Sequence, residues 1–363
     1  MRWKNWSGWA SLAIILGLVN PVVTYATRTP VALEAQAQQR NRYMWKSLHM
    51  GTVISVRLAT TRDRLQDLAK WIESRLTRYE DRMSVHKDTL LNTVNQKSGQ
   101  WVVINEELAR MVQRSIEVAK DSDGVFDPTI NPLVDVWKIG FGGRSVPSAK
   151  AIERAKKKVD YRGIELRQVD GLWQMRVREG QSVDMGGIAK GFIGSALIEG
   201  LRARGVKSAL IDLGGNVATL NRKVTGAPWR VGLQHPNRAR NAYFAIVDVD
   251  DRSLITSGAY ERYFEKDGKR YAHILSAKTG YPAITDISSV SILDRNGAKA
   301  DAWCTALFAM GWDKATRYVN QHPELQVVLM HADLTQVRMS ASLKDRVRVT
   351  QEGLKVEYLG ESR

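Results

Sequence analysis

The chain has 363 residues, of which 44% are hydrophobic, 8% aromatic and 25% charged, a composition that supports a large buried core and argues against a disordered chain. Its formal net charge of +16 suits nucleic acid, an anionic membrane surface or a polyanionic cofactor. The basic residues are scattered, and the longest basic run, residues 156–158, has helical spacing and is expected to be a solvated surface. We therefore expect no nucleic-acid partner.

The first residues form a separate segment. A short basic start precedes a largely apolar run at residues 10–19, the layout of a secretory signal. Residues 35–37 (AQA) fit the small-x-small pattern before a cleavage point, and Ala26 offers an earlier one. We expect residues 1–37 to be a signal peptide or an N-terminal anchor. The protein would then be exported, and either periplasmic or attached to the outer face of the inner membrane.

The elements that follow begin with a strand and a helix. Alternating apolar residues predict a strand at 51–59, and helical spacing predicts helices at 63–78 and 106–121. The second helix should stop before the turn at 122–124. The stretch 125–137 is predicted to be a loop, because Pro128 and Pro132 disfavour regular structure.

Strands dominate the second half of the chain. They are expected at 173–177, 208–213, 229–233, 243–249, 288–293 and 325–330, with helices at 188–204, 300–310 and 313–321. Many strands follow one another without a helix between them, which indicates an α+β fold with one large mixed-sheet domain and surrounding helices. No linker divides the chain after residue 43. We expect this domain at 43–345 and a C-terminal extension at 346–363.

Two glycine pairs follow predicted strands. Gly186 and Gly187 precede a helix whose first N–H groups would favour an anion, and Lys190 would add a positive charge. The segment does not match the nucleotide-triphosphatase loop pattern. Gly214 and Gly215 form a second pair. Each pair could bind a phosphate or be a purely structural turn.

Three further residues have side chains suited to catalysis. Asp301 and Thr305 lie four apart in a predicted helix, so one face presents two hard oxygen ligands of the kind Mg²⁺ prefers. A capping Asp and an ordinary Thr are the alternative. His273 follows a hairpin whose turn is Asp267-Gly268, and it could accept a proton near neutral pH or serve as a structural residue. The single cysteine, Cys304, is expected to be a small buried residue.

Taken in order, these segments resemble the ApbE family of FAD:protein FMN transferases. The similarity covers most of the chain after residue 43. Its blocks are MGT (50–52), DGVFDPTINPLVDVW (123–137), VDMGGIAKGF (183–192), LIDLGGN (210–216), LITSGAYERYFEKDGKRYAHIL (254–275), TGYP (279–282) and ADAWCTALFAMG (300–311). Seven collinear blocks make a chance match improbable.

The resemblance implies an enzyme that splits FAD at its diphosphate. The FMN part would pass to a threonine hydroxyl of a target protein in an electron-transfer chain, and AMP would be released. It implies Mg²⁺ held by Asp301, Thr305 and the Gly187 carbonyl, with His273 as the base. It further places FAD contacts at Met50, Val125, Phe126, Asp127, Asp184 and Lys190. Membrane association of the exported protein would come from its N-terminus.

The chain departs from the family pattern at several positions. Ser276 and Ala277 replace an Asp-Pro pair, and Ser195 replaces an aspartate. Residues 84–95 form a shortened segment with His86 in place of an aromatic residue and Leu90 in place of a Glu. These changes leave two alternatives to transfer: a non-catalytic FAD-binding protein, and a hydrolase that releases FMN and AMP to water.

Overall fold

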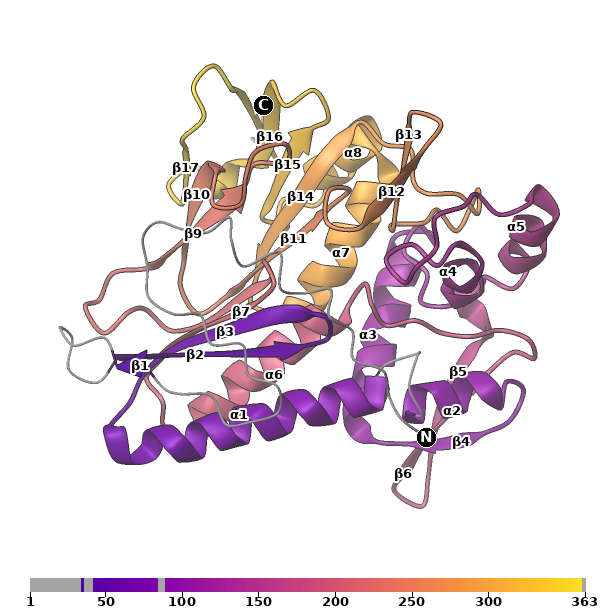
Figure 1. Ribbon diagram of the computed structural model, residues 1–363, viewed down its shortest axis with the longest axis horizontal. Coiled ribbons are helices and arrows are strands. Elements are labelled where there is room, and N and C mark those ends of the chain that lie inside the picture. The colour runs from indigo at the N-terminus through magenta and orange to yellow at the C-terminus, as the bar shows by residue number, and fades with distance from the viewer. Residues whose placement is uncertain (1–33, 36–41, 84–88, 361–363) are drawn as a thin grey trace, which may run out of the picture.

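The fold is built on a ten-stranded sheet with the order β1-β2-β3-β7-β8-β11-β14-β15-β16-β18 (Figure 1). The computed structural model describes residues 34–35, 42–83 and 89–360, so most of the predicted segment 1–37 lies outside the described residues. Every neighbouring pair in the sheet is antiparallel except β16 and β18, which are parallel. The strands are β1 (Glu34–Ala35), β2 (Arg42–His49), β3 (Thr52–Ala59), β7 (Ser208–Leu213), β8 (Val217–Leu220), β11 (Ser253–Gly258), β14 (Ile287–Asp294), β15 (Val327–His331), β16 (Gln336–Ser340) and β18 (Lys355–Leu359).

Three smaller sheets complete the strand content of the described chain. They are β4-β6-β5, β17-β10-β9 and the hairpin β12-β13. Their strands are β4 (Val102–Ile104), β5 (Ile164–Val169), β6 (Leu172–Val177), β9 (Trp229–Gln234), β10 (Tyr243–Val249), β12 (Tyr263–Lys266), β13 (Lys269–Ala272) and β17 (Val347–Val349). Residues after 345 therefore supply one strand, β17, to a small sheet and another, β18, to the large one.

The helices surround these sheets, so the α+β expectation is confirmed. They are α1 (Arg62–Met83), α2 (Leu90–Gln96), α3 (Glu106–Asp121), α4 (Asn131–Trp137), α5 (Ala149–Lys156), α6 (Ala189–Ala203), α7 (Gly297–Met310) and α8 (Trp312–Gln321). Helix α7 packs on β11 and β14, α6 packs on β7 and β8, and α1 packs against α6 and β2 (Figure 1). No helix of the described chain is long and apolar enough to cross a bilayer.

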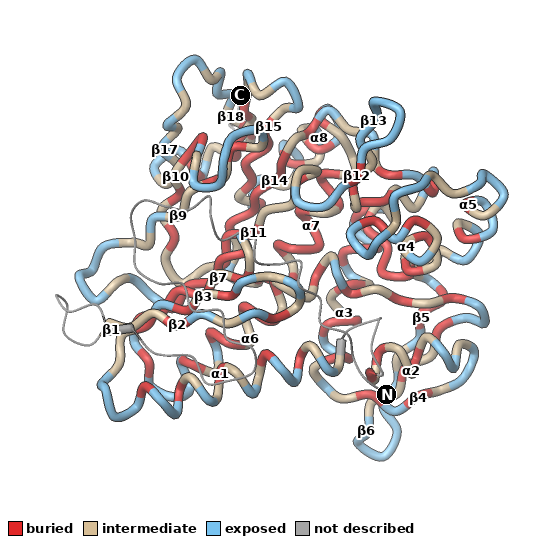
Figure 2. Tube along the Cα trace, in the orientation of Figure 1, coloured by how far each residue is buried: buried red, intermediate tan, exposed pale blue. Residues whose placement is uncertain are grey.

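Strand β14 is buried on both faces of the large sheet. Val290 and Ile292 join the core beneath α7, whereas Leu293 joins a second core beneath β9 and β10. Successive side chains of a strand point to opposite faces, so each face packs against a separate layer. Figure 2 shows buried residues concentrated along β11, β14 and α7. The candidate site is positioned by this rigid central layer.

The expected loop at 125–137 is wrong for its second half, which forms α4. Pro132 stands in the first turn of that helix, where its missing N–H has no helical partner to lose. Trp137 at the end of α4 is buried, and its indole N–H donates to the carbonyl of Gly280 at 2.8 Å. Burial of Trp137 in the tertiary structure therefore stabilises a helix that the two prolines made difficult to predict from sequence.

Other boundaries follow local signals. Helix α3 has the predicted bounds, because Asn105 caps its start and Gly124, at φ 72°, closes its end. Helix α7 begins three residues before the predicted position, because the Asn296 side chain accepts from the Lys299 N–H and caps an earlier turn. A single asparagine among small residues is a weak signal in sequence.

Candidate active site

Helices α6 and α7 approach so closely that backbone touches backbone. A Cβ on Gly191 would lie 2.0 Å from the Gly297 carbonyl oxygen, and a Cβ on Gly297 would lie 2.5 Å from the Gly191 carbonyl oxygen. Only glycine at both positions allows this crossing. It brings the first turn of α6 against Asp301, one turn into α7.

Asp301 is a buried carboxylate that caps α6. It is 3% exposed, and its Oδ2 accepts from the Gly191 N–H at 2.8 Å. Burial raises the pKa of Asp301, while the charge of Lys190 and the N–H groups of Gly191 and Lys190 oppose that rise. A divalent cation beside the carboxylate would stabilise its ionised form in the same way.

The other two predicted metal ligands lie next to Asp301. Thr305 follows it by one turn on α7, and its hydroxyl donates to the Asp301 carbonyl at 3.3 Å, which leaves oxygen lone pairs for a cation. Gly187 faces this hydroxyl, because a Cβ there would lie 3.4 Å from Thr305 Oγ1. One carboxylate, one hydroxyl and one carbonyl form an oxygen set that fits Mg²⁺ completed by water and substrate. Within the described chain no three His, Cys, Asp or Glu side chains gather as a metal site.

The start of α6 differs from the open anion cradle expected there. The Gly186 N–H donates to Asp184 Oδ1 at 2.6 Å, and the Gly191 N–H donates to Asp301. These two N–H groups therefore face carboxylates. The positive end of the helix dipole therefore stabilises the Asp301 carboxylate. A bound phosphate would instead interact with Lys190 and with a cation held by Asp301.

The loop before α4 packs against the start of α6. The Asp184 N–H donates to the Pro128 carbonyl at 2.8 Å, and the buried Phe126 ring lies beside Gly187. Asp127 is also buried: its Oδ1 accepts from the N–H and hydroxyl of Thr129, and its Oδ2 accepts from the Tyr161 N–H. Burial raises the pKa of Asp127. Its carboxylate thus organises this loop, and Val125 lies half-buried at the loop's start.

His273 has a defined tautomer. Its Nδ1 lies 3.2 Å from the Arg262 carbonyl oxygen, which can only accept, so Nδ1 carries the proton and the lone pair is on Nε2. Removal of the ring from water, together with the charges of Arg262 and Lys190, lowers the pKa of His273 to about 4. The half-buried imidazole is therefore a neutral base near pH 7.

Lys190 connects these groups. Its positive charge favours the neutral form of His273 and the ionised forms of Asp301 and of Asp212 at the end of β7. Burial has the larger effect on each pKa: it lowers that of His273 and raises those of the two aspartates. His273, Asp301 and Asp212 therefore share the electrostatic field of one ammonium group.

The turn between β2 and β3 and the turn after β7 are packed together. Met50 and Gly51 form the turn between β2 and β3 with φ of 51° and 70°. A Cβ on Gly214 would lie 2.2 Å from Thr52 Oγ1, so the turn after β7 touches this hairpin. Met50 is half-buried against the core beneath β2 and β3.

Sequence reasoning missed Asn216, which follows the second glycine pair. It is 2% exposed, and its Oδ1 accepts from the Thr256 N–H at 3.2 Å, whereas its Nδ2 has no hydrogen-bond partner. A buried donor without a partner is costly unless a ligand or water accepts from it. An asparagine directly after a glycine pair was the available signal.

The departures from the family pattern fall in different places. The Ser276 hydroxyl accepts from the Thr279 N–H at 3.2 Å, so it still closes the turn in which Ala277 lies. Leu90 begins α2 and packs against the core, and His86 lies outside the described residues.

The buried Cys304 donates its S–H to the Ile255 carbonyl, and burial raises the pKa of its thiol. A reactive cysteine is therefore not part of this site.

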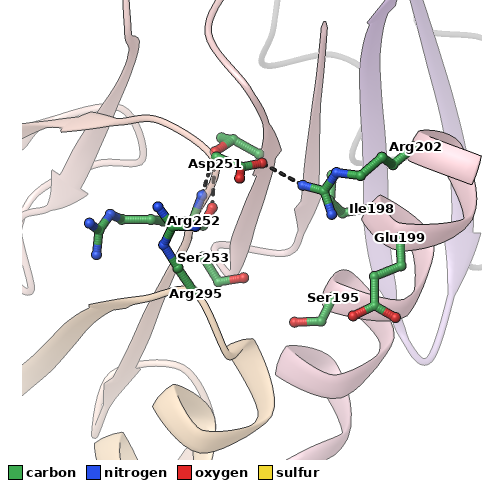
Figure 3. Close-up of a pocket in the computed structure, with 9 residues that line it drawn as sticks. Ser195, Ile198, Glu199, Arg202, Asp251, Arg252, Ser253 and Arg295 are labelled. Atoms are coloured by element: carbon green, nitrogen blue, oxygen red, sulfur yellow. Dashed lines mark hydrogen bonds and ion pairs between the residues drawn. The ribbon is translucent and has the colours of Figure 1, made fainter. Parts of the chain in front are cut away.

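A pocket of about 140 Å³ lies further along α6, toward its C-terminal end (Figure 3). It is lined by Ser195, Ile198, Glu199, Arg202, Thr219, Asp251, Arg252, Ser253 and Arg295. None of the predicted site residues lines it. Ser195, the replacement for the family aspartate, uses its Oγ to accept from the Gly297 N–H at 3.0 Å, which ties the two helices together.

Comparison with known proteins decides the family. Residues 50–329 match the family model described as "ApbE family". The chain belongs to the ApbE family. The ApbE relatives include the FAD:protein FMN transferase of Treponema pallidum, 35% identical over 85% of this chain and 89% of the relative. That of Klebsiella pneumoniae is 31% identical over 79% of this chain and 89% of the relative.

Solved ApbE structures share the fold. The ApbE protein of Thermotoga maritima superposes with a TM-score of 0.76 at 27% identity, covering 85% of this chain and 99% of that one. The Pseudomonas stutzeri flavinyl transferase ApbE, in its apo form, superposes with a TM-score of 0.71 at 26% identity, covering 82% and 93%. The expected family and fold class are thereby confirmed. The roles assigned to single residues stay predictions.

Proposed function

We propose that this protein is an FAD:protein FMN transferase that attaches FMN to a threonine hydroxyl of a target protein and releases AMP. FAD as substrate and a protein acceptor follow from the names of the relatives. The observation that carries the assignment to this site is the crossing of α6 and α7, which sets the Asp301 carboxylate against the Gly191 N–H and Gly187 beside Thr305. The charge of Lys190 acts on both Asp301 and His273. A buried carboxylate, a cation and a neutral base are the parts that phosphoryl transfer needs.

The reaction would be an in-line displacement at the FMN phosphorus. The threonine oxygen forms a bond to that phosphorus, the bond to the AMP oxygen breaks, and the threonine proton passes to Nε2 of His273. Lys190 would stabilise the charge that develops on the phosphate oxygens. Mg²⁺ held by Asp301, Thr305 and the Gly187 carbonyl would neutralise the diphosphate when bound. The Arg262 carbonyl keeps the base in the required tautomer.

Met50, Val125, Phe126, Asp127 and Asp184 are proposed to line the FAD site around these groups. Gly187 touches both the Phe126 ring and Thr305, which places the loop before α4 next to the proposed metal site. The Asp184 N–H holds the same loop through Pro128. Because the Asp127 carboxylate is already bonded within the loop, its effect on FAD would be to fix the loop shape.

The test is a flavinylation assay. Purified protein is mixed with FAD, Mg²⁺ and a threonine-bearing electron-transfer subunit, with EDTA and a Thr→Ala target as controls. We expect a covalent fluorescent band and one AMP per flavin attached, both lost in each control. FMN and AMP released without a band would identify a hydrolase. Unchanged FAD that stays bound would identify a binding protein.

We also propose that the protein is exported and acts in the periplasm or on the outer face of the inner membrane. The support is the basic start and apolar run of residues 1–37. Cell fractionation with N-terminal sequencing tests it: the expected result is a periplasmic or membrane-attached protein. Recovery in the cytoplasm with residues 1–37 intact would overturn it.

A further inference from the structure

His49 is held between two glutamates of one helix. It is the last residue of β2 and is 7% exposed. Its Nε2 lies 3.0 Å from Glu73 Oε1, and its Nδ1 lies 3.2 Å from Glu80 Oε2. Both glutamates belong to α1, two turns apart on one face, so the ring bridges them.

Each ring nitrogen of His49 has its own carboxylate partner. An imidazole carries a hydrogen-bonding nitrogen on two sides of the ring, so one side chain can reach two groups of α1 at once. The two contacts together fix the ring, and with it the end of β2, against α1.

The contacts of His49 with Glu73 and Glu80, called the clamp below, lie directly before the turn that carries Met50. His49 pairs with Thr52 across the hairpin, and Met50 between them has the left-handed φ of 51°. A non-glycine residue holds that conformation only when its surroundings fix it. The cross-strand neighbour Thr52 is uncharged. Within the described chain, the charged groups that hydrogen-bond the His49 ring are Glu73 and Glu80.

We propose that His49, held between Glu73 and Glu80, is a positioning residue for flavin binding. The clamp fixes the Met50-Gly51 turn to α1 and so sets the position of the Met50 side chain. This inference rests on the proposed function, in which Met50 contacts FAD. His49 itself is not proposed to touch the substrate.

The first test measures FAD affinity in the presence of Mg²⁺ for the wild type, His49→Gln and the control His322→Gln. His322 pairs with Glu324 at the end of α8, outside the site. The donors of a glutamine are on a single nitrogen, whereas His49 meets the two glutamates with two different ring nitrogens. We therefore expect His49→Gln to lose one contact and the Kd for FAD to rise about tenfold, with kcat at saturating FAD retained. The control should match the wild type. Equal Kd values in all three proteins would overturn the proposal, whereas a wild type that binds no FAD would overturn the proposed function.

The second test uses Glu73→Gln and Glu73→Ala, which leave His49 unchanged. A glutamine amide keeps a hydrogen-bonding partner for Nε2, whereas alanine leaves Nε2 without one. We expect the Kd for FAD of Glu73→Ala to rise, with kcat at saturating FAD retained, and that of Glu73→Gln to stay nearer the wild-type value. Urea unfolding of the same proteins shows whether stability follows the same order. A Kd for FAD of Glu73→Ala equal to that of the wild type would contradict the assigned role of His49.

Discussion

At the scale of single residues, burial favours the uncharged forms of both key groups of the site. It lowers the pKa of His273 and raises the pKa of Asp301. For the histidine, this keeps a base available at neutral pH. For the aspartate, it makes a bound cation strongly favourable, because the cation stabilises the ionised form. The same physical effect, burial, thus suits His273 to its proposed role as the base and Asp301 to its proposed role as a metal ligand.

The pH dependence of transfer should reflect His273. Its base form is neutral and exists above its pKa of about 4, so activity should persist at mildly acidic pH and fall as the pH approaches 4. An ordinary histidine would lose activity near pH 6.5. The measurement is the single-turnover rate at saturating FAD and Mg²⁺ from pH about 4 to about 8, with circular dichroism to exclude unfolding. A midpoint near 6.5 would contradict the assigned environment.

Asp301 should separate metal use from helix capping. Asp301→Asn keeps an oxygen that can accept from Gly191 but loses the charge, so we expect at least tenfold more Mg²⁺ to be needed with little change in unfolding free energy. Asp301→Ala loses both functions and should also destabilise the protein by about 1 kcal/mol. Mg²⁺ titrations of activity and urea unfolding measure the two effects. Wild-type Mg²⁺ dependence in Asp301→Asn would remove this residue from the metal site.

At the scale of elements, the crossing of α6 and α7 assembles the proposed metal site. Gly187 lies before α6, Asp301 and Thr305 lie on α7, and the glycine contact between Gly191 and Gly297 sets their separation. The Ser195 hydroxyl accepts from the Gly297 N–H one turn further along. The crossing of the two helices therefore sets the positions of the three proposed oxygen ligands, those of Gly187, Asp301 and Thr305.

Two alanine substitutions on α6 should differ in severity. A Cβ at Gly191 would overlap backbone of α7, so Gly191→Ala should cost roughly 3 kcal/mol and abolish transfer. A Cβ at Gly194 would meet only the side chains of Leu213 and Ala218, at 3.1 and 3.2 Å. Gly194→Ala should therefore be milder, because improved helix propensity offsets part of the crowding. Equal losses of unfolding free energy and activity would contradict the backbone contact.

The sequence predicted those elements whose signals are local. The apolar spacing of α3 and the turn at 122–124 predicted its bounds, and Asp267-Gly268 predicted the turn of the β12-β13 hairpin. Helix α4 was missed because its stability comes from the burial of Trp137 against Gly280, 143 residues away. The bond from Gly191 to Asp301 was missed for the same reason, because the two residues are 110 positions apart. It depends on where distant segments meet, which local patterns do not contain.

At the scale of the whole molecule, the candidate site joins segments from most of the chain. Its predicted residues lie on the β2-β3 turn, the loop before α4, the start of α6, the loop of His273 and α7. The loop before α4, the start of α6 and α7 are in contact with one another, and α7 packs on β11 and β14 of the large sheet (Figure 1). The chemistry therefore exists only in the folded protein, and ligand binding and folding should be linked.

Binding of FAD with Mg²⁺ should stabilise the fold. A ligand at one hundred times its Kd raises the unfolding free energy by about 2.7 kcal/mol when it binds only the folded state. We expect a clear rise in Tm with FAD and Mg²⁺, a smaller one with FAD and EDTA, and no difference between those two conditions for Asp301→Asn. Differential scanning fluorimetry that follows tryptophan emission measures this. An equal rise in Tm with and without Mg²⁺ in the wild type would show that FAD binding does not depend on the metal and would contradict this prediction.

The most direct measurement compares transfer by wild type and His273→Ala at equal FAD occupancy. Both proteins are saturated with FAD and Mg²⁺, bound flavin is quantified, and covalent FMN on the threonine target is followed over time. Loss of the base should lower the transfer rate by about 100-fold or more while bound FAD stays the same. Transfer by His273→Ala at the wild-type rate would contradict the central claim that His273 activates the acceptor threonine.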